Sequence, residues 1–227
     1  ADLAALESGE ERLAALETAA AAARDAYDVA AATLSRKRAT AAGKLEKAVT
    51  AELPALKLER AQFIVQVESD PERRSESGND EVSFLVRTNP GTAAGPLMKV
   101  ASGGELSRFL LALKVALADR GSAPTLVFDE IDTAVGGAVA DAIGARLARL
   151  AGQVQVLSVT HAPQVAARAG AHLLVAKQTV KGGKAVTTSV TPLDSTRRRE
   201  EIARMLAGAT VTDEARAAAE RLILGAA

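Results

Sequence analysis

Two carboxylates stand side by side at Asp129 and Glu130, directly after the apolar run Thr125-Leu126-Val127-Phe128. A short apolar run predicts a fully buried strand, and ligands of open α/β sheets bind at the carboxyl ends of the strands. Carboxylate oxygen suits a hard cation, and a carboxylate held firmly at a strand end can act as a general base. The pair therefore predicts Asp129 as a Mg²⁺ ligand and Glu130 as a general base. The alternative is that the pair only opens a solvated loop.

A candidate anion site precedes this strand. Ser102, Gly103 and Gly104 come just before leucines spaced along one helix face, which are Leu106, Leu110, Leu113 and Leu117. Backbone N–H groups at a helix start lack partners within the helix, and the helix dipole favours negative charge there. Such a start is usually only a cap. Together with the two carboxylates, however, it favours a phosphate and therefore a nucleotide.

A second apolar run, from Val154 to Val159, ends in Thr160 and His161. This pattern predicts a second buried strand that delivers His161 to the same edge of the sheet. There the imidazole could donate a hydrogen bond to a terminal phosphate. His172 has no comparable setting and is predicted to be structural.

Several segments resemble the motifs of one ATPase superfamily. S-G-G-E-L-S-R at 102–108 is similar to the signature motif of ATP-binding-cassette ATPases, and L-V-F-D-E at 126–130 resembles Walker B. I-D-T-A-V-G-G at 131–137 resembles the D-loop, and V-T-H-A-P-Q-V-A-A at 159–167 resembles the switch histidine segment. With E-I-A-R-M-L-A-G at 201–208, the combination most resembles the RecN family of SMC-like bacterial DNA repair proteins.

This resemblance covers the chain from about Phe63 onward and implies an ATPase with ATP and Mg²⁺ as cofactors. The nucleotide-binding residues that it implies are Ser102, Gly103, Gly104, Glu105 and Asp132. Asp132 would organise the interface between two heads or cap the helix that follows. Gln164 would lie in the same neighbourhood. Glu105 stands where transporters commonly have Gln, which disfavours a transporter cassette.

The sequence contains no phosphate loop of the form G-x-x-x-x-G-K-[ST]. In the family this motif lies in the N-terminal half, so the resemblance implies that the chain is part of a longer protein and inactive alone. Walker B and the switch would serve one ATP site, and the signature would complete the site of an opposite head. The implied partners are the N-terminal lobe of the same protein, a second head in an ATP-bound dimer, and DNA through the complete protein. The alternatives are a non-catalytic dimerisation module or the head of another SMC-type chromosome protein.

The first 53 residues are rich in alanine and free of proline. Apolar residues recur every seven positions, at Leu6, Leu13, Ala20, Tyr27, Leu34, Ala41 and Ala48. The repeat predicts a long coiled-coil helix that ends at Pro54. Its partner helix is absent from this sequence, unless the chain self-associates or the segment folds back on itself. We therefore expect an arm over residues 1–56 and a C-terminal head lobe over residues 57–227.

Beyond the arm, strands and helices alternate. We expect strands at 63–67, 82–86, 173–176 and 186–190, paired as two hairpins, and terminal helices near 196–207 and 213–224. A helix between the two strands near 125–160 favours parallel pairing. The predicted fold class is α/β, the C-terminal lobe of an ABC/SMC-type P-loop ATPase head. Its sheet would be mostly parallel and preceded by the coiled-coil helix.

Composition narrows the class of protein. The 227 residues are 48% hydrophobic but only 2% aromatic, which predicts an aliphatic, alanine-rich core. The absence of cysteine excludes disulfides and thiolate metal sites, and two histidines disfavour a zinc site. A net charge of zero is not typical of a dedicated nucleic-acid binder, so the basic runs at 36–38 and 197–199 favour solvated faces. No run is long enough for a membrane span, so a cytoplasmic, nucleoid-associated protein is expected.

Overall fold

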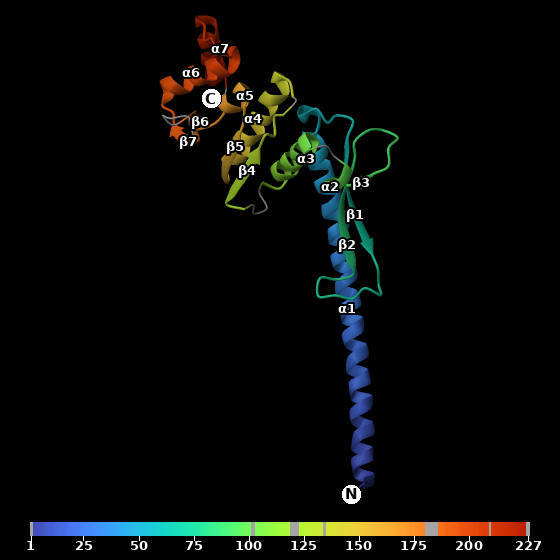
Figure 1. The fold of residues 1–227 in the computed structure, drawn as a ribbon. Coiled ribbons are helices and arrows are strands. Elements are labelled where there is room, and N and C mark those ends of the chain that lie inside the picture. Colours follow the sequence, from blue (N-terminus) through green and yellow to red (C-terminus); the bar gives the residue numbers. More distant parts are fainter. Residues whose placement is uncertain are drawn as a thin grey trace.

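The structure is a computed structural model that describes residues 2–100, 103–118, 123–133, 135–179, 186–208 and 210–225. Its longest element is the helix α1 (Asp2–Glu52), which extends away from the rest of the molecule (Figure 1). At 1.5 Å per residue this helix is about 75 Å long. Pro54 opens the short 3-10 helix η1 (Pro54–Leu56), so the predicted end of the long helix at Pro54 is confirmed.

The strands β1 (Gln62–Ser69) and β2 (Asp80–Arg87) form the first predicted hairpin and pair in antiparallel register from Gln62↔Arg87 to Ser69↔Asp80. The short strand β3 (Gly95–Pro96) pairs with the other edge of β2. The hairpin lies along the half of α1 nearest the head (Figure 1). Its long polar loop therefore reaches back along the helix instead of projecting into solvent.

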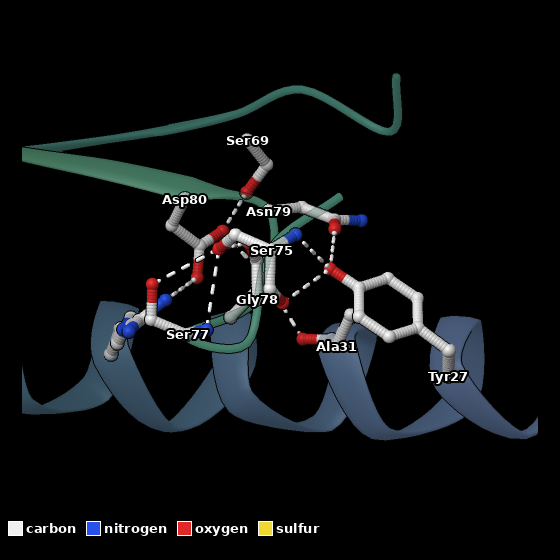
Figure 2. Close-up of polar contacts among 10 residues, drawn as sticks. Tyr27, Ala31, Ser69, Ser75, Ser77, Gly78, Asn79 and Asp80 are labelled. Carbon is white, nitrogen blue, oxygen red and sulfur yellow. Dashed lines mark hydrogen bonds and ion pairs between the residues drawn. The ribbon is translucent and has the colours of Figure 1, made fainter. Parts of the chain in front are cut away.

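Polar contacts hold this loop on α1, as Figure 2 shows. The Tyr27 hydroxyl donates a hydrogen bond to Asn79 Oδ1 at 2.6 Å and accepts one from the Ser75 N–H at 3.0 Å. Gly78 has a φ of +91° at the turn, and a Cβ there would lie 3.1 Å from Leu34 Cδ2. A residue without a side chain is thus required where the loop lies flat against the helix.

Asp80 is the most enclosed of these polar groups, because none of its side chain is exposed. Its carboxylate accepts hydrogen bonds from Ser35 Oγ at 2.6 Å, Ser69 Oγ at 2.5 Å and Arg38 Nη1 at 2.8 Å. These donors lower the pKa of Asp80 from 3.8 to about 2. We call the contacts of residues 74–80 with residues 27–38 the arm clamp.

Because of the arm clamp, the buried positions of α1 differ from those that the heptad pattern predicts. Leu13 and Leu16 are exposed, and the prediction of a seam facing a partner helix stands there. Beyond Tyr27 that prediction is wrong, because the head's own hairpin covers the helix and the buried positions are Ala31, Ala42, Val49 and Leu53. A seven-residue repeat drifts by about 20° per heptad around a straight helix. The buried positions are therefore shifted by one residue, from Ala41 and Ala48 to Ala42 and Val49.

A parallel pair of strands forms the centre of the head. After α2 (Leu97–Val100) and α3 (Gly103–Ala116), the chain enters β4 (Thr125–Asp129), α4 (Gly137–Ala151), β5 (Gln155–Val159) and α5 (Pro163–Ala167). Strands β4 and β5 pair in parallel register from Thr125↔Gln155 to Asp129↔Val159. The predicted parallel pairing is confirmed, and the other two sheets among the described residues are antiparallel.

One aliphatic core joins the arm to the head. Its fully buried members come from the base of α1, the turn through η1, the hairpin, α3 and α4, and include Val49, Leu53, Leu56, Phe63, Val86, Phe109, Leu111, Ile143 and Leu150. Glu52, in the last turn of α1, also accepts hydrogen bonds from Arg146 and Arg149 of α4, each at 2.9 Å. The last turns of the arm thus pack as part of the head, while the boundary at residues 56 and 57 stays a prediction.

The chain ends in a smaller unit. Strands β6 (Leu173–Thr179) and β7 (Val186–Pro192) form the second predicted hairpin, followed by helices α6 (Ser195–Ala207) and α7 (Asp213–Leu224). Both helices begin at side-chain caps, in which Asp194 accepts from the Arg197 N–H and Thr212 from the Ala215 N–H. Their small side chains, with Ala166 and Ala167 of α5, form a second core. No helix among the described residues has the length and hydrophobicity to cross a membrane.

One face of the parallel pair is bare. Leu126, Phe128 and Val156 face the core, whereas Val127, Leu157 and Val159 are 66%, 47% and 57% exposed. The predictions that β4 and β5 are buried strands are therefore wrong for this chain. Parallel strands are normally covered on both faces. We call the exposed side chains of β4 and β5 the bare sheet face.

Candidate functional site

The carboxyl ends of β4 and β5 carry three of the predicted site residues. Asp129 is the last residue of β4 and is paired with Val159, the last residue of β5. Glu130 follows Asp129 directly, while Thr160 and His161 follow β5, and the side chains of Asp129, Glu130 and His161 are exposed. The two strands thus present two carboxylates and an imidazole at one edge, as the sequence predicts.

Glu130 has a strained but firmly held backbone. Its φ is +47°, a left-handed conformation that costs a non-glycine residue roughly 1–2 kcal/mol. The Glu130 N–H donates to Val159 O at 3.1 Å, and Glu130 O accepts from the Thr133 N–H at 3.1 Å. Strain of this kind clusters at functional sites, where the surroundings impose it. An Asp-Glu pair carries no sequence signal for this conformation, so it could not be predicted.

Asp132 lies inside the molecule and is only 1% exposed. Its Oδ2 accepts hydrogen bonds from Thr160 Oγ1 at 2.5 Å and from the Ala162 N–H at 3.0 Å. The cap residue of α4 is Gly136, with no side-chain hydrogen bond, so the prediction that Asp132 caps this helix is wrong. The carboxylate instead bonds to the loop that carries His161. Its role at an interface between heads stays a prediction.

The start of α3 lies beside the D-loop of the same chain. Gly103 and Gly104 form its first residues and Glu105 lies in its first turn, whereas Ser102 lies outside the described residues. A Cβ on Gly104 would lie 3.7 Å from Thr133 O and 3.4 Å from Arg108 Nη1. The signature segment therefore contacts the D-loop within one chain, next to Asp132.

Arg108 is a residue of this region that the sequence analysis did not single out. Its side chain is largely buried, and burial lowers the pKa of its guanidinium, against the influence of Glu105. Its Nε has no hydrogen-bond partner among the described residues. An arginine one turn after Gly104 on an amphipathic helix looks like an ordinary solvated residue, so sequence alone gave no reason to select it.

Helix α5 packs unusually close to α4. A Cβ on Gly137 would lie 3.0 Å from Gln164 Nε2, and one on Gly144 would lie 3.2 Å from Gln164 O. Arg168, at the end of α5, makes a two-pronged ion pair with Asp141 of α4 at 2.9 and 3.0 Å. Gln164 thus lies beside the residues that follow the D-loop, which is the neighbourhood predicted for it.

The possible metal site involves few protein ligands. No three His, Cys, Asp or Glu side chains converge within the parts of the chain that the structure describes. Mg²⁺ in nucleotide sites is usually held by one or two carboxylates together with phosphate oxygens and water. An exposed Asp129 at a strand end fits that kind of site.

Comparison with known proteins identifies the family. No protein-family model matches the chain. The DNA repair protein RecN of Vibrio cholerae serotype O1 is 40% identical over 224 residues, which are 99% of this chain. RecN of Rickettsia conorii is 43% identical over 197 residues (87% of this chain), and RecN of Xylella fastidiosa 44% over 195 residues (86%). The chain belongs to the RecN family. It spans only 35% to 40% of the length of these relatives.

Solved structures share the fold. The Smc head domain with a coiled coil and joint from Pyrococcus yayanosii matches 73% of this chain and 29% of its own, with a TM-score of 0.54 and 19% identity. The Smc head domain with an extended coiled coil from Pyrococcus furiosus, solved with the C-terminal domain of ScpA, matches 74% of this chain and 39% of its own. Its TM-score is 0.50 and its identity 18%. The predicted fold class, a C-terminal lobe of an SMC-type head preceded by a long helix, is confirmed.

Proposed function

We propose that this chain is the C-terminal half of an SMC-like ATPase of DNA double-strand-break repair. In this proposal ATP joins two heads, and its hydrolysis releases them while the complete protein handles DNA in the cytoplasm, on the nucleoid. The observation that carries the proposal is the position of Asp129, Glu130 and His161, which all lie at or directly after the carboxyl ends of two paired parallel strands. Membership of the RecN family supports the link to DNA repair.

Asp129, Glu130 and His161 have different roles in the proposed reaction. Mg²⁺, when bound beside Asp129, would neutralise charge on the phosphates and polarise the γ-phosphate. Asp129 holds this ion, directly or through water. Glu130 accepts a proton of the attacking water, which requires a carboxylate oxygen about 3 Å from that water. The water oxygen bonds to the γ-phosphorus as the bond from that phosphorus to the bridging oxygen breaks, so that ADP leaves with the bridging oxygen and phosphate is released. His161 donates a hydrogen bond to the γ-phosphate and responds to its loss.

The remaining predicted residues belong to the shared interface. Ser102, Gly103, Gly104 and Glu105 complete the ATP site of the opposite head, because amides at a helix start attract phosphate. Asp132 belongs to the D-loop beside them. The nearness of Gly104 to Thr133 O supports a single surface that contains both segments.

The bare sheet face supports a missing lobe. Three apolar side chains of a parallel pair are exposed, and burial of such groups contributes roughly 25 cal/mol per Å². A further lobe of the same protein, which carries the phosphate loop, covers this face in our proposal. Without it the isolated chain is inactive. The absent phosphate loop equally suits a second candidate, a non-catalytic dimerisation module.

The test is reconstitution with the N-terminal lobe of the parent protein, supplied in trans or in one polypeptide. We expect ATP hydrolysis only in the reconstituted head, and Glu130→Gln should slow it by about 10²- to 10⁴-fold while ATP binding remains. ATP-bound dimers of this variant should accumulate. A reconstituted head that binds ATP but hydrolyses none would favour the assembly module, and undiminished hydrolysis by Glu130→Gln would remove Glu130 from the role of base.

A further inference from the structure

Two hydrogen bonds tie the D-loop to the switch segment within this chain, and a third closes the arrangement within the switch segment. Thr160 Oγ1 donates to Asp132 Oδ2 at 2.5 Å, and the Ala162 N–H donates to the same oxygen at 3.0 Å. The Ala162 N–H also lies 2.9 Å from Thr160 Oγ1, which accepts from it. The three groups form a closed triangle, which we call the switch latch.

The enclosure of Asp132 makes the switch latch a strong contact. A carboxylate that is 1% exposed has lost its hydration and depends on the donors that the protein supplies. Two donors reach Asp132 Oδ2, both from residues 160–162, and Oδ1 has no partner among the described residues. Hydrogen bonds to an ionised acceptor are about twice as strong as neutral ones. Asp132 therefore bonds to the switch segment more firmly than to any other part of the described chain.

The latch fixes the backbone on both sides of His161. Before it, Val159 O accepts from the Glu130 N–H, and after it Ala162 begins α5 without a side-chain cap. Ala162 O accepts from the N–H groups of Val165 and Ala166 at 3.1 Å each. The imidazole itself is exposed, so its direction depends on these backbone anchors.

We propose that Asp132 and Thr160 are positioning residues that hold His161 toward the ATP site of their own head. Asp132 thus acts within one chain, through the switch segment. The geometry of the latch stands on its own, while its effect on catalysis rests on the proposed function. Thr160 gains a role that the sequence motifs do not assign to it.

Amide exchange tests the latch in this chain without any nucleotide. Asp132→Ala removes both bonds to the carboxylate, and exchange of the Ala162 N–H should become about 10- to 100-fold faster. Thr160→Val keeps the side-chain shape and removes the hydroxyl, so exchange should also rise, whereas Thr160→Ser should stay near the parent value. Amides of α4 serve as a control for intact folding. Unchanged exchange at Ala162 in both Asp132→Ala and Thr160→Val would overturn the latch.

Kinetics of the reconstituted head test the catalytic consequence. Misplacing a catalytic group by about 1 Å costs up to about 100-fold in rate, so Thr160→Val should lower kcat by about 10- to 100-fold. KM for ATP should change by less than about threefold, and Thr160→Ser should restore kcat. A rise in KM for ATP of about 10- to 100-fold, without a fall in kcat, would overturn the positioning role. Failure of the parent head to hydrolyse ATP would refute the proposed function, while the exchange experiment would still decide on the latch.

Mixed heads separate action within a head from action on its partner. In a mixture of Asp132→Ala with Glu130→Gln, action within the head impairs both sites, so hydrolysis should not rise above the reduced rate of the Asp132→Ala head alone. Action across the interface would leave one intact site and restore hydrolysis, which would overturn the proposal. Ser102→Arg mixed with Glu130→Gln is the matched control, because the signature serves the opposite site and this mixture should recover hydrolysis.

Discussion

Gly144 lies where α4 and α5 touch, and Gly144→Ala places one methyl group between them. The new Cβ would lie 2.9 Å from Arg168 Cδ, 3.2 Å from Gln164 O and 3.3 Å from Val165 Cα. Two of these neighbours are backbone atoms, and the third belongs to a side chain held by Asp141. Helix α5 must therefore move away from α4.

The magnitude follows from two opposing effects. Alanine in a helix interior is more favourable than glycine by about 1 kcal/mol. Overpacking a closed contact costs about 1–3 kcal/mol. Gly144→Ala should therefore destabilise the chain by about 1 kcal/mol, or roughly 2–4 °C in melting temperature for a protein of this size.

Gly43 provides the matched control, since it is exposed in α1 and a Cβ there meets nothing within 4 Å. Gly43→Ala should stabilise the chain by about 1 kcal/mol, because only the propensity difference acts. Thermal unfolding of both variants, followed by circular dichroism, should separate them by roughly 4–8 °C. An increase in melting temperature of Gly144→Ala equal to that of Gly43→Ala would refute the packing argument.

Three further predictions concern the clamp, the shared site and the base of the arm. The pKa of Asp80 is lowered to about 2, so its stabilising contribution is complete above about pH 4 and is lost as the pH falls toward 2. Asp80→Asn should flatten that part of an acid-unfolding curve, which Asp25→Asn, on an exposed part of α1, should leave unchanged. Ser102→Arg should leave ATP binding by reconstituted monomeric heads near normal but abolish ATP-dependent dimers in light scattering. Normal dimers would contradict the shared site. Glu52→Gln should lower the melting temperature by roughly 2–6 °C, because it weakens the charged hydrogen bonds to α4. No change on calorimetry would show that these contacts add nothing.

The sequence predicted the parts of the fold that have local signals. The apolar run before Asp129, the stop at Pro54 and the helices near 196–207 and 213–224 each depend on neighbours in the chain. Helix and strand positions followed from such patterns. The pairing of β4 with β5 followed from the helix between them.

Contacts between distant segments could not be predicted in this way. Asp132 and Thr160 are 28 residues apart, and neither residue type predicts a contact with the other. The arm clamp depends on a loop that meets α1 more than 40 residues away, so the heptad pattern alone pointed to a partner helix. The exposure of Val127 reflects surroundings that a strand's own residues do not encode.

Because of the arm clamp, α1 moves together with the head as one rigid body. The helix is attached at Tyr27 by the loop and at Glu52 by α4, points that are about 38 Å apart at 1.5 Å per residue. A helix fastened at two such points cannot pivot about its last turn. If the head tilts by about 10°, the far end of the 51-residue helix moves by about 13 Å, since the displacement is the length times the sine of the angle. Small rotations at the ends of β4 and β5 thus become large movements at the tip of the arm.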